Sequence, residues 1–70
     1  MLLIDYARDV VGLPLRGLYT GRLHVGYTGD PDKAHRMLEA GARVVSTRNT
    51  WSEIEGYEVS FPVGAEAQAA

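Results

Sequence analysis

The chain has 70 residues, no cysteine and a formal net charge of −2, with 46% hydrophobic and 23% charged residues. This length supports one domain with a small core, and the ordinary composition excludes a disordered or fibrous chain. The lack of cysteine excludes a disulfide framework and a thiolate metal site, so we expect a cytoplasmic protein. Charged residues follow the apolar start at once, and we therefore expect neither a signal peptide nor a membrane span.

The charges are unevenly distributed along the chain. Residues 16–48 carry six lysine or arginine side chains against three acidic ones, whereas residues 49–70 carry four glutamates and no basic residue. The acidic total argues against a protein that coats nucleic acid. The two segments either lie next to each other and neutralise, or they form a bipolar surface that docks a charged partner.

The first segment has apolar residues at helical spacing, which predicts a helix over residues 2–11 that ends at Gly12 and Pro14. No residue suited to an N-cap precedes it, so a strand over residues 2–6 is the alternative. Alternating apolar and polar residues then predict a β-hairpin, with strands 15–19 and 22–28 and the turn at Thr20 and Gly21.

The second hairpin strand alternates clearly. Leu23, Val25 and Tyr27 share one face, and His24, Gly26 and Thr28 share the other. Because a strand buries its apolar face, we expect Tyr27 to belong to the core.

Residues 31–40 show the clearest helix signal in the chain. Asp30 is suited to the N-cap, Pro31 to the first helical position, and Gly41 to the position after the end. Helix capping and the helix dipole account for Asp30 and Asp32, so this carboxylate pair does not indicate a metal or acid–base site. We expect an inner stripe of Ala34, Met37 and Leu38, and outer pairs Asp32–Arg36 and His35–Glu39.

The second half of the chain predicts two more strands. Residues 43–47 form the first, which completes a β-α-β crossover with parallel strands from residue 22 to residue 47. The sequence Thr50-Trp51-Ser52-Glu53 has the pattern of a capping box and predicts a short helical turn that ends at Gly56. A final strand over residues 57–61 is closed by Pro62.

The fold class that follows is a small single α+β or α/β domain over residues 1–62. It contains an N-terminal helix, a β-hairpin, a central helix in a β-α-β crossover, a short helical turn and a final strand. Residues 63–70, rich in alanine and without periodicity, are predicted to be a disordered tail. A core this small often gains from self-association, so a homo-oligomer is one expectation.

Few residues suggest chemistry. His24 and His35 are the two histidines, and without a third ligand they do not define a metal site, so we expect no metal and no cofactor. Trp51 lies in a polar loop, where it acts either as a lid over a small core or as an exposed binding anchor. The lid is the interpretation that we adopt at this point.

One part of the chain resembles a known family. Gly17-Leu18-Tyr19 and the segment from His24 to Lys33, which opens a helix, resemble the start of the GIY-YIG nuclease domain over less than a quarter of the chain. The resemblance implies a nuclease that uses one divalent metal. Tyr19 matches the first tyrosine of the family, His24 or Tyr27 the second, and Arg36 substitutes for the helix arginine.

The sequence therefore favours a non-enzymatic interaction protein over an enzyme. We expect it to bind and block or bridge a protein or nucleoprotein partner, as a small phage-type inhibitor of a host system does. The alternatives are a GIY-YIG-like metal-dependent nuclease and a nucleic-acid-binding accessory protein. The predicted partner-binding residues are Lys33, His35, Arg36, Glu39, Arg48 and Trp51.

Overall fold

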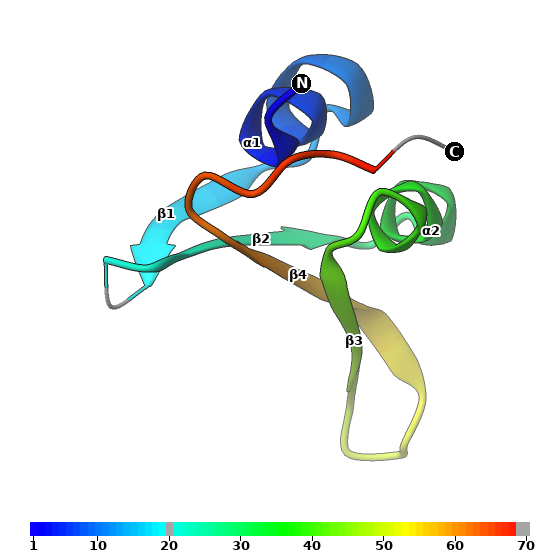
Figure 1. Cartoon of the computed structure of the whole chain (residues 1–70). Helices are drawn as coiled ribbons and strands as arrows, with labels where there is room; N and C mark the ends of the chain where they lie inside the picture. The colour runs from blue at the N-terminus through cyan, green and yellow to red at the C-terminus, as the bar shows by residue number, and fades with distance from the viewer. Residues whose placement is uncertain (20, 69–70) are drawn as a thin grey trace.

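The computed structural model describes residues 1–19 and 21–68, and for residues 16–19 the backbone alone. The described strands form one four-stranded antiparallel sheet, and the helices lie together on one of its faces (Figure 1). This arrangement confirms the α+β class. The elements in chain order are α1 (Leu3–Asp5), η1 (Tyr6–Val11), β1 (Leu15–Tyr19), β2 (Leu23–Thr28), α2 (Pro31–Glu39), β3 (Arg43–Arg48) and β4 (Ile54–Pro62).

The predicted N-terminal helix is present as α1 followed directly by η1, a stretch of π-helix. It ends as expected at Gly12, which has a left-handed φ of 75°. The carbonyl of Ala7 accepts hydrogen bonds from the backbone N–H groups of Gly12 and Leu13. The missing N-cap is replaced from far along the chain, because the N–H of Leu3 donates to the carbonyl of Ala65 at 2.8 Å.

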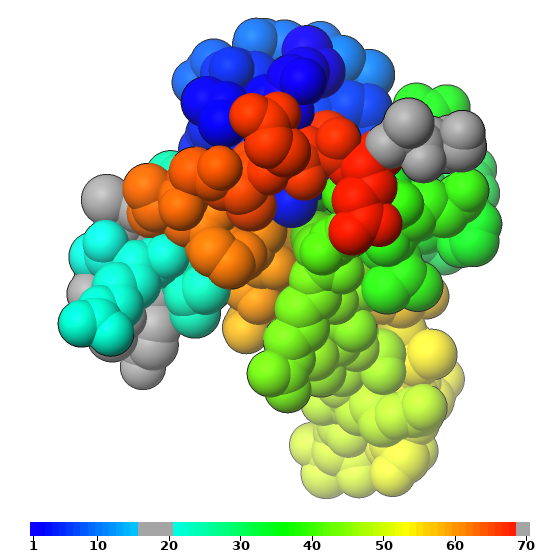
Figure 2. Space-filling view, in the orientation of Figure 1, coloured from blue at the N-terminus to red at the C-terminus, as the bar shows by residue number. Residues whose placement is uncertain are grey.

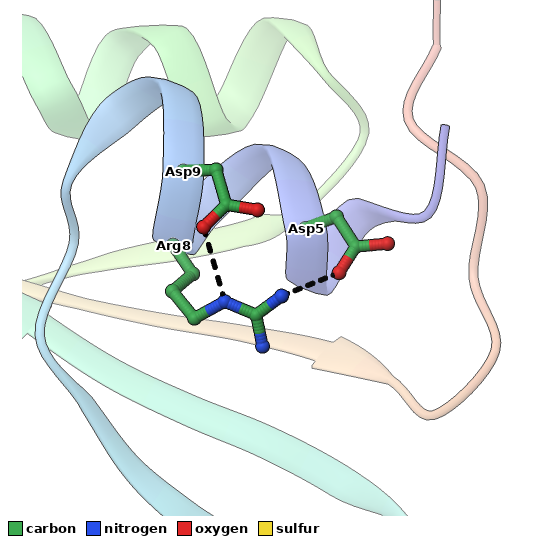
Figure 3. Close-up of polar contacts among 3 residues, drawn as sticks. All are labelled: Asp5, Arg8 and Asp9. Carbon is green, nitrogen blue, oxygen red and sulfur yellow. Dashed lines mark hydrogen bonds and ion pairs between the residues drawn. The ribbon is translucent and has the colours of Figure 1, made fainter.

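The outer side of this helix carries a charged cluster (Figure 3). The Arg8 guanidinium donates to Asp5 at 2.7 Å and to Asp9 at 3.2 Å. The hydrogen bond and the charge of Asp9, together with Asp5, raise the pKa of Arg8 above its ordinary value. All three side chains are exposed, so the cluster marks the solvent side of the helix and contributes little to stability.

The segment expected to be a disordered tail packs against the body as far as Gln68. Glu66 pairs with Leu2 in an antiparallel bridge, and the N–H of Ala67 donates to the carbonyl of Met1 at 2.9 Å. The N–H of Gln68 donates to the carbonyl of Ala40 at 2.9 Å. This segment therefore connects the N-terminal helix to the end of α2, and residues 69–70 of the predicted tail lie outside the described residues.

Helix α2 agrees with the capping signals in the sequence. The Asp30 carboxylate accepts from the N–H of Asp32 at 2.9 Å, and Gly41 has a left-handed φ of 104°. Ala34 and Met37 are buried as expected, but Leu38 is 53% exposed. The predicted stripe was wrong at Leu38, because the buried face continues through Ala40, which is the C-cap residue.

The β1–β2 hairpin is confirmed, with Tyr19 opposite Leu23 and a bulge between Leu15 and Gly17. Its turn residue Thr20 lies outside the described residues.

The sheet order is β1-β2-β4-β3, so the predicted β-α-β crossover with parallel strands is present, but its two strands are not adjacent. Strands β2 and β3 run in the same direction, but β4 lies between them and pairs antiparallel with both. The reason is the short connection after β3: β4 begins only five residues after Asn49, so it must return beside β3 as a hairpin. The predicted helical turn before Gly56 is accordingly a hairpin turn.

The inner face of the sheet packs on the helices and carries the core. Val59 and Phe61 of β4 are fully buried, and their cross-strand partners on β2 are Gly26 and His24. The His24 and Phe61 rings lie 5.3 Å apart. The core cluster consists of Leu3, Ala7, Val11, Leu13, Met37, Ala40, Ala42, Val59 and Phe61.

The opposite side of the sheet, which we term the open face, carries Leu23, Val25 and Tyr27 of β2 together with Val45 of β3. The predicted alternation of β2 is present, but the expectation that Tyr27 belongs to the core is wrong. The inner position goes to Gly26 because Leu13 to Leu15 cross the strand closely there: a Cβ on Gly26 would lie 2.8 Å from the carbonyl oxygen of Pro14. The lack of a side chain at Gly26 therefore determines which face of β2 lies toward the helices.

Candidate functional site

The most prominent surface feature is the outer part of the β3–β4 hairpin, residues 45–57, which we term the arm. The core residues of β4 lie in its other half, at Val59 and Phe61, and Val44 is the β3 residue packed against the core. Figure 2 shows the arm, in yellow-green and yellow, as a lobe that projects away from the helices. A two-stranded ribbon is marginal in water, so its turn requires local support.

Asn49 provides much of this support. Its side-chain oxygen accepts from the backbone N–H of Trp51 at 2.9 Å and from that of Glu53 at 3.0 Å. Its backbone N–H donates to the carbonyl of Glu53 at 2.9 Å, and its carbonyl accepts from the N–H of Ser52 at 3.0 Å. Asn49 thus closes the turn by the Asx-type bonding for which asparagine is favoured.

Arg48 completes the turn from the preceding strand. Its guanidinium donates to the carbonyl of Ser52 at 2.7 Å. Ser52 has a left-handed φ of 63°, a conformation that costs a non-glycine residue free energy. The hydrogen bonds of Asn49 and Arg48 offset that cost, so the tip is held in one backbone conformation.

Trp51 stands on this tip with 78% of its surface exposed. The interpretation of Trp51 as a lid over the core is wrong, and the alternative of an exposed position is correct. Ile54 and Val45 on the same arm are 51% and 46% exposed. An exposed tryptophan on a hydrogen-bonded turn is typical of an interaction surface, because a tryptophan there loses little entropy on binding.

The charges on the arm have opposite signs on its two strands. Arg48 lies on β3, Glu53 directly precedes β4 and Glu55 lies near its start, and all three are exposed. Charges of both signs therefore lie close to Trp51 in the chain, and they do not form a patch of a single sign.

The other predicted binding residues lie on α2, apart from the arm (Figure 1). His35 and Glu39 form the expected pair at 2.7 Å, and the Lys33 ammonium reaches the carbonyl of Gly12 at 3.4 Å. Arg36 and Glu39 border a shallow depression of about 520 Å³. The six predicted residues thus form two groups and not one site. The depression is lined by Tyr6, Val10, Arg36, Glu39, Ala40, Ala67 and Gln68.

The residues suggested by the nuclease resemblance are also dispersed. Tyr27 lies on the open face, His24 packs on Phe61 on the inner face, and Arg36 borders the depression beside the C-terminal segment. The Tyr19 side chain lies outside the described part of the structure. Within residues 1–19 and 21–68, no three histidine or acidic side chains are grouped closely enough to hold a metal ion.

The comparisons with known proteins do not identify a family. No family model matches the chain, and neither the curated proteins nor the solved structures show a significant similarity. Among the described residues, no helix is both long and apolar enough to cross a membrane.

Asn49, Val45 and Ile54 are the arm residues that the sequence analysis did not single out. Asn49 carried a usable signal, because asparagine is favoured in turns, where its side chain accepts hydrogen bonds from the backbone nearby. Val45 and Ile54 carried none, since their exposure depends on where the helices end over the sheet.

Proposed function

We propose that this chain is a non-enzymatic interaction protein that binds a protein partner in the cytoplasm through the arm, and thereby blocks or bridges that partner. The observation that supports this proposal most directly is the 78% exposure of Trp51 on a turn fixed by Asn49 and Arg48. An exposed indole on a preorganised turn fits the pattern of an interface hot spot, which inserts into a pocket of the partner.

The charges around Trp51 favour a protein over a nucleic acid as the partner. Glu53 and Glu55 are exposed beside the indole, and the chain has a net charge of −2. Carboxylates at the contact would repel phosphates, whereas a protein pocket for the indole with a basic rim would match them. The partner that we propose is therefore a protein with an apolar pocket flanked by lysine or arginine.

The test compares the wild-type chain with Trp51→Ala and with the control Leu38→Ala, which removes an apolar side chain that is 53% exposed on α2. The captured protein is identified from extracts of the native cell, purified and titrated directly by calorimetry. A hot-spot tryptophan contributes about 2 kcal/mol or more, so Trp51→Ala should weaken binding by about 30-fold or more, and Leu38→Ala by less than about 3-fold.

Two results would contradict the proposal. One is equal affinity of the wild type and Trp51→Ala for the purified partner, since the arm would then not be the contact. The other is capture of nucleic acid alone, with an affinity that falls steeply as salt is added, which would identify a nucleic-acid binder.

A further inference from the structure

The open face of the sheet points to a second interaction, and Val45 belongs both to this face and to the arm. Leu23, Val25 and Tyr27 are half-buried, yet they belong neither to the core cluster nor to the partly buried residues packed against it. In an antiparallel sheet with one solvated face, the positions on that face are normally polar. Strand β2 has the reverse arrangement, with its apolar residues on the side away from the helices.

The Tyr27 ring covers part of β4 on the open face. It lies across β4 above Gly56, where a Cβ would overlap the phenol oxygen and Cζ, and Cε2 would be 3.0 Å away. An aromatic ring that covers a strand glycine shields the backbone of that strand. In the register of the sheet, Glu58 lies between Tyr27 and Val45, so the apolar residues of the open face lie on both sides of one carboxylate.

The helices lie on the other face of the sheet, so they do not cover the open face (Figure 1).

The charges on the open face suit a second copy of the same chain. In the register of the sheet, the described charged side chains of β2, β3 and β4 on this face include one basic residue, Arg43, and one acidic residue, Glu58. A two-fold interface brings each patch against itself, so a face with a single sign of charge would repel its copy. One charge of each sign permits contacts between Arg43 of one copy and Glu58 of the other.

The core gives a physical reason for association. Ten hydrophobic residues are buried in the described chain, and four of these are alanines, at positions 7, 34, 40 and 42. A core of this composition buries little apolar surface for each residue that folding must order. We propose that the open face is the interface of a two-fold homodimer, in which the Leu23, Val25, Tyr27 and Val45 side chains of the two copies pack against each other.

The experiment is sedimentation equilibrium on the wild type and on two matched variants, Val45→Lys and Val10→Lys. Val45 is 46% exposed on the open face, and Val10 is 53% exposed on η1, on the helical side. A lysine at residue 45 faces Glu58 across β3 and β4, so the monomer fold is retained, as circular dichroism will verify. Two copies, however, would bring both lysines into an apolar contact.

At tens of micromolar, we expect the wild type and Val10→Lys at twice the chain mass of 7.6 kDa, and Val45→Lys at 7.6 kDa. The melting temperature of the wild type should also rise with protein concentration, whereas that of Val45→Lys should not. A wild type that stays at 7.6 kDa up to millimolar concentration would overturn the proposal. So would a dimer that Val10→Lys dissociates and Val45→Lys leaves intact.

Discussion

The substitution Gly56→Ala tests the position of Tyr27 on the open face. A methyl group at residue 56 would overlap the phenol ring, so the ring must leave its place above β4. The φ of Gly56 is not in the left-handed region, and the penalty therefore comes from the ring alone. Overpacking of this kind costs about 1–3 kcal/mol. For a chain of this size, each kcal/mol lowers the melting temperature by about 4–8 °C.

The measurement is urea unfolding followed by circular dichroism at one fixed protein concentration. The control is Gly29→Ala, because a Cβ there meets no atom within 4 Å, and we expect a change below about 0.5 kcal/mol. A double-mutant cycle gives the decisive comparison: in a Tyr27→Ala background, Gly56→Ala should cost almost nothing. A cost that is equal with and without the Tyr27 ring would refute the placement of that ring over β4.

Two further predictions concern stability. Thr47→Val should raise the free energy of unfolding by about 1 kcal/mol in urea titrations, because the Thr47 hydroxyl is buried without a hydrogen-bond partner among the described residues; a loss of similar size would contradict this. Truncation after Gly64 should lower the free energy of unfolding by about 3 kcal/mol, since three interelement backbone hydrogen bonds are lost at about 1 kcal/mol each. Glu66→Gln removes only the exposed ion pair with the N-terminal amine at 3.4 Å and should cost less than about 1 kcal/mol, so equal losses would show that the backbone contacts are unimportant.

The sequence predicted the elements whose ends are determined locally. Helix α2 begins at Asp30 and ends before Gly41 because each signal acts within a few residues of itself. The same holds for the left-handed Gly12 after η1. The residues that make these interactions are close together in the sequence, so the helix ends can be predicted from a single sequence.

The sequence did not predict which strands pair or which face is inner. The alternation of β2 separates Leu23, Val25 and Tyr27 from their neighbours, but it does not show which set meets the helices. The outcome depends on the close approach of Pro14 to Gly26, a contact that no periodicity reveals. The position of β4 between β2 and β3 likewise depends on the hairpin turn after β3, which the capping-box pattern had wrongly predicted to be helical.

The candidate site was predicted in part. Arg48 and Trp51 were chosen from the sequence, and the structure brings them together at the tip of the arm. The exposure of Trp51 was not predicted, because a tryptophan among polar residues is equally compatible with a small core. The helix residues Lys33, His35, Arg36 and Glu39 were chosen for their outward face alone, and that criterion gives no information on their distance from Trp51.

The hydrogen bond from Leu3 to Ala65 has a consequence for the order in which the chain folds. The first helix has no N-cap of its own, and the carbonyl that receives its N–H lies 62 positions further along. During synthesis, the first turn of this helix can therefore form its hydrogen bond to Ala65 only after residue 65 has been added. The first helix is synthesised well before Ala65, so it becomes ordered late relative to its synthesis, and contacts of such long range slow the folding of a domain.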